Sequence, residues 1–115
     1  MKKLIYSPDY QEKIIQLRND LDLKYGQKTR EKVLAEIDHR IQLLKTYNYL
    51  GISLREKYGF DCDFYHIYVA NNFVFYEVEE ESINIINMYN EREEYIIKFL
   101  GSVNKLHEDS IVHID

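Results

Sequence analysis

A few polar side chains in the second half of the chain have the types needed for acid–base or phosphate chemistry. His66 lies in an apolar, strand-like run, and Arg92 and Tyr95 stand three positions apart in a stretch typical of a helix. Histidine exchanges a proton near neutral pH, Arg contacts phosphate or acidic surfaces, and Tyr donates a proton or stacks. These three residues are the candidates for catalysis. Each also has a structural interpretation: strand packing for His66, charge balance among neighbouring Glu residues for Arg92, and helix packing for Tyr95.

A second set of residues has the character of a target-binding surface. Arg55 and Lys57, followed by Tyr58, come after the first helical region, and with Arg92 and Tyr95 they form the predicted target-binding set. A solvated loop is the alternative interpretation of residues 55–58. The basic stretch from Lys24 to Lys32 is typical of a solvated helix face, and it also suits contact with an acidic partner.

Metal and cofactor chemistry has no support in the sequence. The four His residues, at positions 39, 66, 107 and 113, show no ligand spacing, and no glycine-rich phosphate loop is present. Cys62 is the single cysteine and has no His at a suggestive spacing, so we interpret it as a small strand residue. The prediction is a protein without metal or cofactor.

Composition sets the class of protein. The 115 residues suit one domain, and a hydrophobic content of 45% with one Pro and four Gly suits a packed core. No apolar run is long enough for a membrane span, and no signal peptide is recognisable, so we expect a cytoplasmic protein. Residues 1–57 hold twelve Lys/Arg against eight Asp/Glu, whereas residues 58–115 hold three against twelve. Such an acidic chain is poorly suited to binding a bare phosphate backbone.

The first half of the sequence predicts a strand followed by two helices. Residues 3–6 are a short apolar run, and Ser7-Pro8 is a typical helix start, with Ser as cap and Pro in the first turn. Apolar residues then follow at helical spacing, and Tyr25-Gly26 interrupts them. A second helix is predicted up to about Tyr47-Asn48, before Gly51. The apolar stripes of the two helices are Tyr10, Ile14, Leu17 and Leu21, then Leu34, Ile37, Ile41 and Leu44.

From Phe60 the apolar period changes to two, which predicts strands. The first strand is expected over residues 60–69, a tight turn over 70–73, a second strand over 73–78 and a third over 83–89. Asn90 with Glu93 three residues later is a capping-box pattern, so a last helix is expected to begin there and to stop at Gly101. The predicted fold is α+β: a helical hairpin packed on a small, mainly antiparallel sheet, in the order β-α-α-β-β-β-α.

This order, together with several short motifs, resembles the RelE/ParE superfamily of toxins from type II toxin–antitoxin systems. The resemblance covers about residues 3–101. Its motifs are Tyr6-Ser7-Pro8, the second helix with Gly51 after it, the strand Phe73–Val78, the run Ile83–Ile86, the Arg92-x-x-Tyr95 element and Phe99-Leu100-Gly101. We therefore expect a toxin domain over 1–101 and a C-terminal tail over 102–115. The tail could be frayed or could add an edge strand.

The resemblance implies a cognate antitoxin as partner, in a toxin–antitoxin hetero-oligomer, and leaves two activities open. RelE-like members cut messenger RNA on the ribosome, and ParE-like members inhibit DNA gyrase without nuclease activity. The nucleases of the family carry Arg and Lys on the sheet, whereas residues 59–91 here contain neither, and Asn90 stands where many members have His. Eleven Tyr residues suit an interface. We expect a ParE-like toxin, associated with growth inhibition and plasmid stabilization; an endoribonuclease and a non-toxic binding protein are the alternatives.

Overall fold

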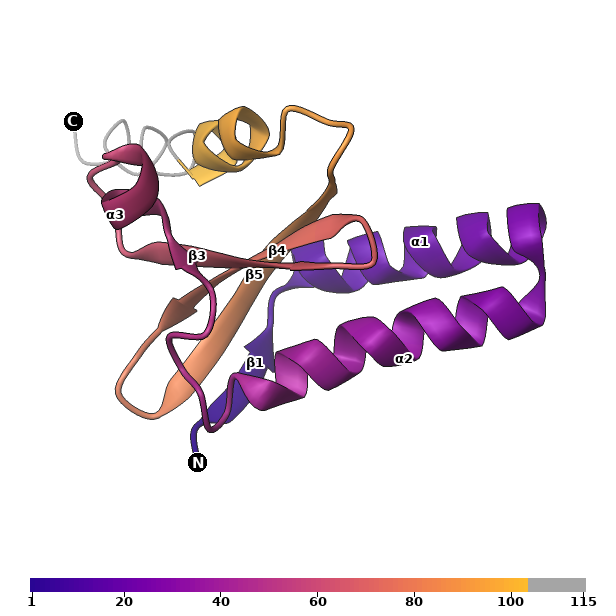
Figure 1. Ribbon diagram of the computed structural model, residues 1–115, viewed down its shortest axis with the longest axis horizontal. Helices are drawn as coiled ribbons and strands as arrows, with labels where there is room; N and C mark the ends of the chain where they lie inside the picture. The colour runs from indigo at the N-terminus through magenta and orange to yellow at the C-terminus, as the bar shows by residue number, and fades with distance from the viewer. Residues whose placement is uncertain (104–115) are drawn as a thin grey trace.

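The computed structural model describes residues 1–103 as a five-stranded sheet with helices on both faces (Figure 1). The strand order is β1-β5-β4-β3-β2; β1 runs parallel to β5, and the other neighbours are antiparallel. Helices α1 and α2 cover one face, and α3 and a C-terminal helix over residues 95–103 cover the other. The strands are β1 (Lys3–Tyr6), β2 (Ile52–Ser53), β3 (Phe64–Val69), β4 (Asn72–Val78) and β5 (Ser82–Asn90). The helices are α1 (Pro8–Tyr25), α2 (Gln27–Leu43) and α3 (Leu54–Tyr58).

The helical hairpin begins as the sequence predicts. The hydroxyl of Ser7 accepts the amide N–H of Tyr10 at 3.0 Å and donates to the carbonyl of Ile86, so the helix cap also ties α1 to β5. Gly26, with φ of +90°, joins the two helices. The predicted end of the second helix is wrong by several residues, because α2 ends at Leu43 and Leu44 turns its side chain into the core.

The main core lies between the helical hairpin and the sheet. It requires an irregularity in β5, where Phe75 faces Asn87 but Tyr76 faces Ile85. Ile86 and Asn87 therefore both lie on the face opposite the hairpin, and Met88 returns to the face covered by the hairpin. The buried members of this core are Tyr10, Ile37, Ile41, Leu44, Ile67, Val69, Val74, Tyr76, Ile83, Ile85 and Met88.

A close approach of the chain to Tyr76 fixes the connection between α2 and β2. The amide N–H of Gly51 donates to the buried Tyr76 hydroxyl at 2.9 Å. A Cβ at position 51 would lie 2.6 Å from the carbonyl oxygen of His66 and 2.8 Å from the Tyr76 hydroxyl. Only glycine fits this place without movement of the sheet, which explains the glycine after the second helix.

The segment before β3 differs from the prediction. The alternation from Phe60 to Phe64 is not a strand: β3 begins only at Phe64, and two short elements, β2 and α3, precede it. The guanidinium of Arg55 binds the carboxylates of Asp61 and Asp63 at 2.9 and 3.1 Å, and this folds the acidic positions into a bend. The polar positions of the alternation face this cation instead of one side of a sheet.

The tight turn between β3 and β4 is confirmed. Ala70 and Asn71 both adopt positive φ, 49° and 65°, as a two-residue hairpin requires. The last helix begins later than predicted, at residue 95. The main-chain N–H of Asn90 donates to the carboxylate of Glu93 at 2.9 Å, as in a capping box, but Asn90 is still part of β5. Gly101 lies within the helix and does not end it.

The boundary at residue 101 stays a prediction, and the interpretation of the tail concerns residues 104–115, which lie outside the described part. Among residues 1–103, no helix is long and apolar enough to cross a membrane.

The contact between Gly51 and Tyr76 gives a test of the fold. Tyr76→Phe leaves the Gly51 amide without its acceptor, and we expect a loss of about 1–3 kcal/mol in the free energy of unfolding. Gly51→Ala forces a methyl group into occupied space and should cost a similar amount or more. Urea unfolding measures both, with the exposed Tyr49→Phe as control. A Tyr76→Phe variant as stable as the parent would contradict this account.

Candidate functional site

His66 is buried on β3, on the sheet face opposite the helical hairpin. Only 2% of the residue is exposed, and its Nδ1 has no hydrogen-bond partner within residues 1–103. Its Nε2 lies 3.4 Å from the hydroxyl of Tyr58 on α3. Burial lowers the pKa of His66, a main-chain hydrogen-bonding contribution of the residue itself opposes this, and the positive charge of Lys57 lowers the pKa further. The surroundings favour the neutral imidazole, and the ring is packed rather than accessible as an acid or base.

Tyr95 is brought to the same face of the sheet. Its ring stacks on Phe73 with 3.8 Å between centroids and lies 6.4 Å from the His66 ring. One turn later in the C-terminal helix, the fully buried Phe99 stacks on Phe75 at 4.1 Å. These two stacked pairs seat the helix on the sheet, so the sheet face around His66 is filled by the chain itself.

Arg92 is not on a helix face with Tyr95, contrary to the prediction. It lies exposed in the turn between β5 and the C-terminal helix, where its amide N–H donates to Asn90 Oδ1 at 3.0 Å. Charge balance with the neighbouring Glu residues stays a prediction, and Arg92 forms no ion pair with any described residue. Glu93 instead pairs with Lys98 at 2.9 Å.

Arg55 and Lys57 lie on α3, away from Arg92. Arg55 is occupied by Asp61 and Asp63, whereas Lys57 is exposed beside the ring of Tyr58. Leu54 of α3 and Val103 belong to one apolar cluster, so α3 adjoins the far end of the C-terminal helix, and Arg92 precedes its start (Figure 1). The predicted target-binding residues are therefore not gathered at one place.

A groove between the helical hairpin and the sheet was not predicted. The outer half of α1 and α2 extends beyond the sheet, next to the turn between β3 and β4 (Figure 1). A hollow of about 780 Å³ lies there, with Leu17, Leu21 and Val33 on the helix side and Ala70 and Met88 on the sheet side. Its other lining residues are Lys13, Gln16, Asp20, Lys24, Tyr25, Thr29, Lys32, Glu36, Asn71, Asn72, Asn90, Glu91, Arg92 and Glu93.

The groove forms where the helical hairpin extends past the sheet. The apolar stripe of α1 continues from Tyr10 to Leu21, but Tyr10 is its only fully buried member. Leu17 packs at the edge of the main core and Leu21 lies beyond it, so both are only half-buried. The spacing of the stripe gives no signal for the groove, because it specifies the helix face and not where the sheet ends.

Charges of both signs surround the groove. Lysines 13, 24 and 32 and Arg92 alternate with Asp20, Glu36, Glu91 and Glu93. Lys13 is held by the sheet: its Nζ donates to the carbonyl of Met88 at 2.9 Å and lies 3.9 Å from the Tyr89 ring centroid, and burial lowers its pKa. Within the described residues, Lys24, Lys32 and Arg92 have no ion-pair partner and are free to meet charges of a ligand.

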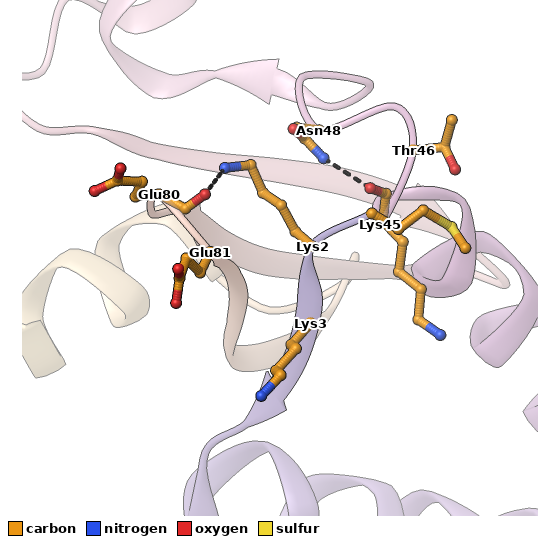
Figure 2. A pocket seen from close by; sticks show the side chains of 8 residues that line it. Lys2, Lys3, Lys45, Thr46, Asn48, Glu80 and Glu81 are labelled. Carbon is orange, nitrogen blue, oxygen red and sulfur yellow. Dashed lines mark hydrogen bonds between the residues drawn. The ribbon is translucent and has the colours of Figure 1, made fainter.

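A second hollow, of about 650 Å³, lies at the start of the chain. Figure 2 shows Lys2 reaching the main chain at Glu80, whereas the side chains of Lys3 and Lys45 extend away from it. The Lys2 ammonium donates to the carbonyls of Glu79 and Glu80, which ties the N-terminus to the turn between β4 and β5. We therefore assign this hollow a structural role. No described group of His, Cys, Asp and Glu residues could hold a metal ion.

The fold can be compared with known structures. It is similar to a chain from a solved structure described as the chromosomal ParDE TA system from P. aeruginosa, with a TM-score of 0.66. The match covers 78% of this chain and 96% of the other at 11% sequence identity, so the two chains share a fold. No protein-family model and no curated protein sequence matches the chain.

The positions of Tyr95 and Arg92 predict a loss of stability when the Tyr95 ring is removed and almost none when the Arg92 side chain is removed. Tyr95→Ala removes the ring stacked on Phe73 and should lower the free energy of unfolding by about 2 kcal/mol or more. Tyr95→Phe keeps the ring, and Arg92→Ala removes an exposed, unpaired charge, so each should stay within about 0.5 kcal/mol of the parent. Urea unfolding of the three variants decides. Equal stability of Tyr95→Ala and the parent would show that the helix is not seated by this ring.

Proposed function

We propose that the chain is the toxin of a type II toxin–antitoxin pair and that its antitoxin inserts an amphipathic segment into the groove. The observation that carries the proposal is the partly exposed outer half of the hairpin stripe. Leu17 and Val33 pack at the edge of the main core and Leu21 lies beyond it, and all three are only half-buried and line the groove. Apolar surface rimmed by charge is typical of protein interaction sites. The similarity of the fold to a structure of a ParDE TA system supports the proposal that the protein with this groove is a toxin.

The shape of the groove supports a helical or extended segment as the occupant. One wall is formed by the neighbouring faces of the antiparallel helices α1 and α2. The other wall is formed by the β3–β4 turn and the end of β5. An amphipathic helix lying in such a groove places its apolar positions on Leu17, Leu21 and Val33. Its polar rim would carry charges of both signs, because the rim of the groove does.

We further propose that the toxin acts by binding, as ParE-like inhibitors of DNA gyrase do, and that it works in the cytoplasm. Cleavage of RNA by its own 2′-hydroxyl needs a proton acceptor, a cation for the phosphorane and a proton donor. Between residues 59 and 91 the chain has no Lys or Arg, and His66 is enclosed by the C-terminal helix. The sheet face therefore offers neither cations nor room for a nucleotide.

A RelE-like messenger-RNA endonuclease is the second candidate. The proximity of His66 and Tyr95, with 6.4 Å between ring centroids, is the observation in its favour, because these are groups able to transfer protons. A family member that binds its partner without toxicity is the third candidate. Growth inhibition by the expressed chain separates the third from the other two.

The partner proposal is tested by co-expression with the product of the adjacent gene. We expect the two proteins to co-elute from a sizing column at micromolar concentration. Leu21→Asp places a charge on the groove wall and should weaken binding at least tenfold, about 1.4 kcal/mol. Leu23→Asp is the matched control, because Leu23 on the same helix is 86% exposed and does not line the groove.

Thermal melts of both variants confirm that they are folded. Separate elution of the unmodified proteins would refute the partner proposal. Equal binding by the Leu21→Asp and Leu23→Asp variants would refute the groove as its site.

The mode of action is tested in cells and with purified gyrase. Primer extension on RNA from cells that express the chain should show no cuts within codons, and the purified protein should inhibit gyrase supercoiling. Discrete cuts that require ribosomes would favour the endonuclease. Growth inhibition without either effect would point to a different target.

A further inference from the structure

Three elements meet at the ring of His66. The residue lies on β3, Tyr58 of α3 approaches its Nε2, and Tyr95 of the C-terminal helix lies over the same sheet face. Phe73 and Phe75 from β4 contact it edge to face, with centroid distances of 5.0 and 5.4 Å. Because Phe73 and Phe75 lie beside the ring on the sheet, its isolation from water depends on the rings of α3 and the C-terminal helix.

These surroundings suit a neutral imidazole and oppose a charged one. The described groups from β4, α3 and the C-terminal helix that face it are aromatic rings, and the charged side chain acting on it is the cation Lys57. On β3 itself, the Tyr68 hydroxyl is engaged by Glu91 at 2.7 Å. No described carboxylate lies within ion-pair distance of the ring, and Nδ1 has no acceptor among the described residues. A protonated His66 would be a buried cation without a counter-ion.

The C-terminal helix belongs to a core of its own. Its apolar residues pack with Leu54, Phe75 and Tyr89, whereas the helical hairpin packs on the opposite face of the sheet. A helix whose described residues are held by one small cluster can detach while the rest of the molecule remains folded. We propose that His66 is a proton-operated latch: protonation of His66 detaches the C-terminal helix from the sheet and leaves the helical hairpin and its groove intact.

The direction and size of the effect follow from proton linkage. Above pH 6.5 the imidazole is neutral whether the helix is attached or not, and the full stability of the attached state is present. As the pH falls below 6.5, the detached state takes up a proton more readily than the attached state, because burial lowers the pKa of the attached His66, and attachment therefore weakens. The equilibrium constant for detachment rises between pH 7.5 and 5.5, by at most about tenfold.

Amide hydrogen exchange of the full chain tests the latch. After correction for the intrinsic pH dependence of exchange, residues 95–103 should exchange faster at pH 5.5 than at pH 7.5, by up to about tenfold, while α1 and α2 remain unchanged. A variant with His39, His107 and His113 replaced by Gln should behave like the parent. His66→Phe keeps a ring that cannot be protonated and should abolish the difference.

Two results would overturn the latch. One is equal corrected exchange of residues 95–103 at both pH values; the other is acceleration of the hairpin and the helix together, which would make His66 a residue of global stability. If His66→Phe does not fold, the latch is tested instead by NMR titration of the variant in which His39, His107 and His113 are replaced by Gln. The His66 resonance and the ring resonances of Tyr95 and Phe99 should change with one midpoint, and protonation without change at Tyr95 and Phe99 would exclude a latch.

Discussion

The helical hairpin of this protein extends beyond the sheet on which it packs, and the proposed binding groove depends on this arrangement. The inner half of the hairpin stripe is covered by β3, β4 and β5, and there Ile37 and Ile41 are almost completely buried. In the outer half Leu17 and Leu21 are only half-buried and form one wall of a groove. Burial of apolar surface is the main stabilising term in association, and this surface is where we propose that a partner segment binds.

The opposite face of the sheet has been closed by the chain itself. Ile86 of β5 lies on that face, where α3 and the C-terminal helix form a second core around Phe75 and Phe99. Tyr76 belongs to the main core, but its hydroxyl holds Gly51 and so fixes the connection that leads to α3. The enclosed sheet face and the open groove are the two features on which our proposal of a protein that acts by binding depends.

The sequence predicted the elements with regular spacing and failed where long-range contacts decide. Ser7-Pro8, Gly26 and Asn71 specify local geometry, and the helix start, the helical hairpin and the β-turn were confirmed. The pattern at Phe60–Phe64 was misread because the pairing of Arg55 with Asp61 and Asp63 is invisible to periodicity. The proximity of His66 and Tyr95 and the groove both arise from packing between distant segments, so no local pattern could reveal them.

Hydrogen exchange of the chain, free and in complex with the product of its adjacent gene, tests the central claim most directly. The account predicts slower exchange in the complex along the facing sides of α1 and α2, around the turn at residues 70–72, and at residues 88–93. It predicts no change in α3. Protection confined to α3 and β2, with the outer half of the helical hairpin unchanged, would show that the partly exposed stripe is not the binding site and would contradict the account.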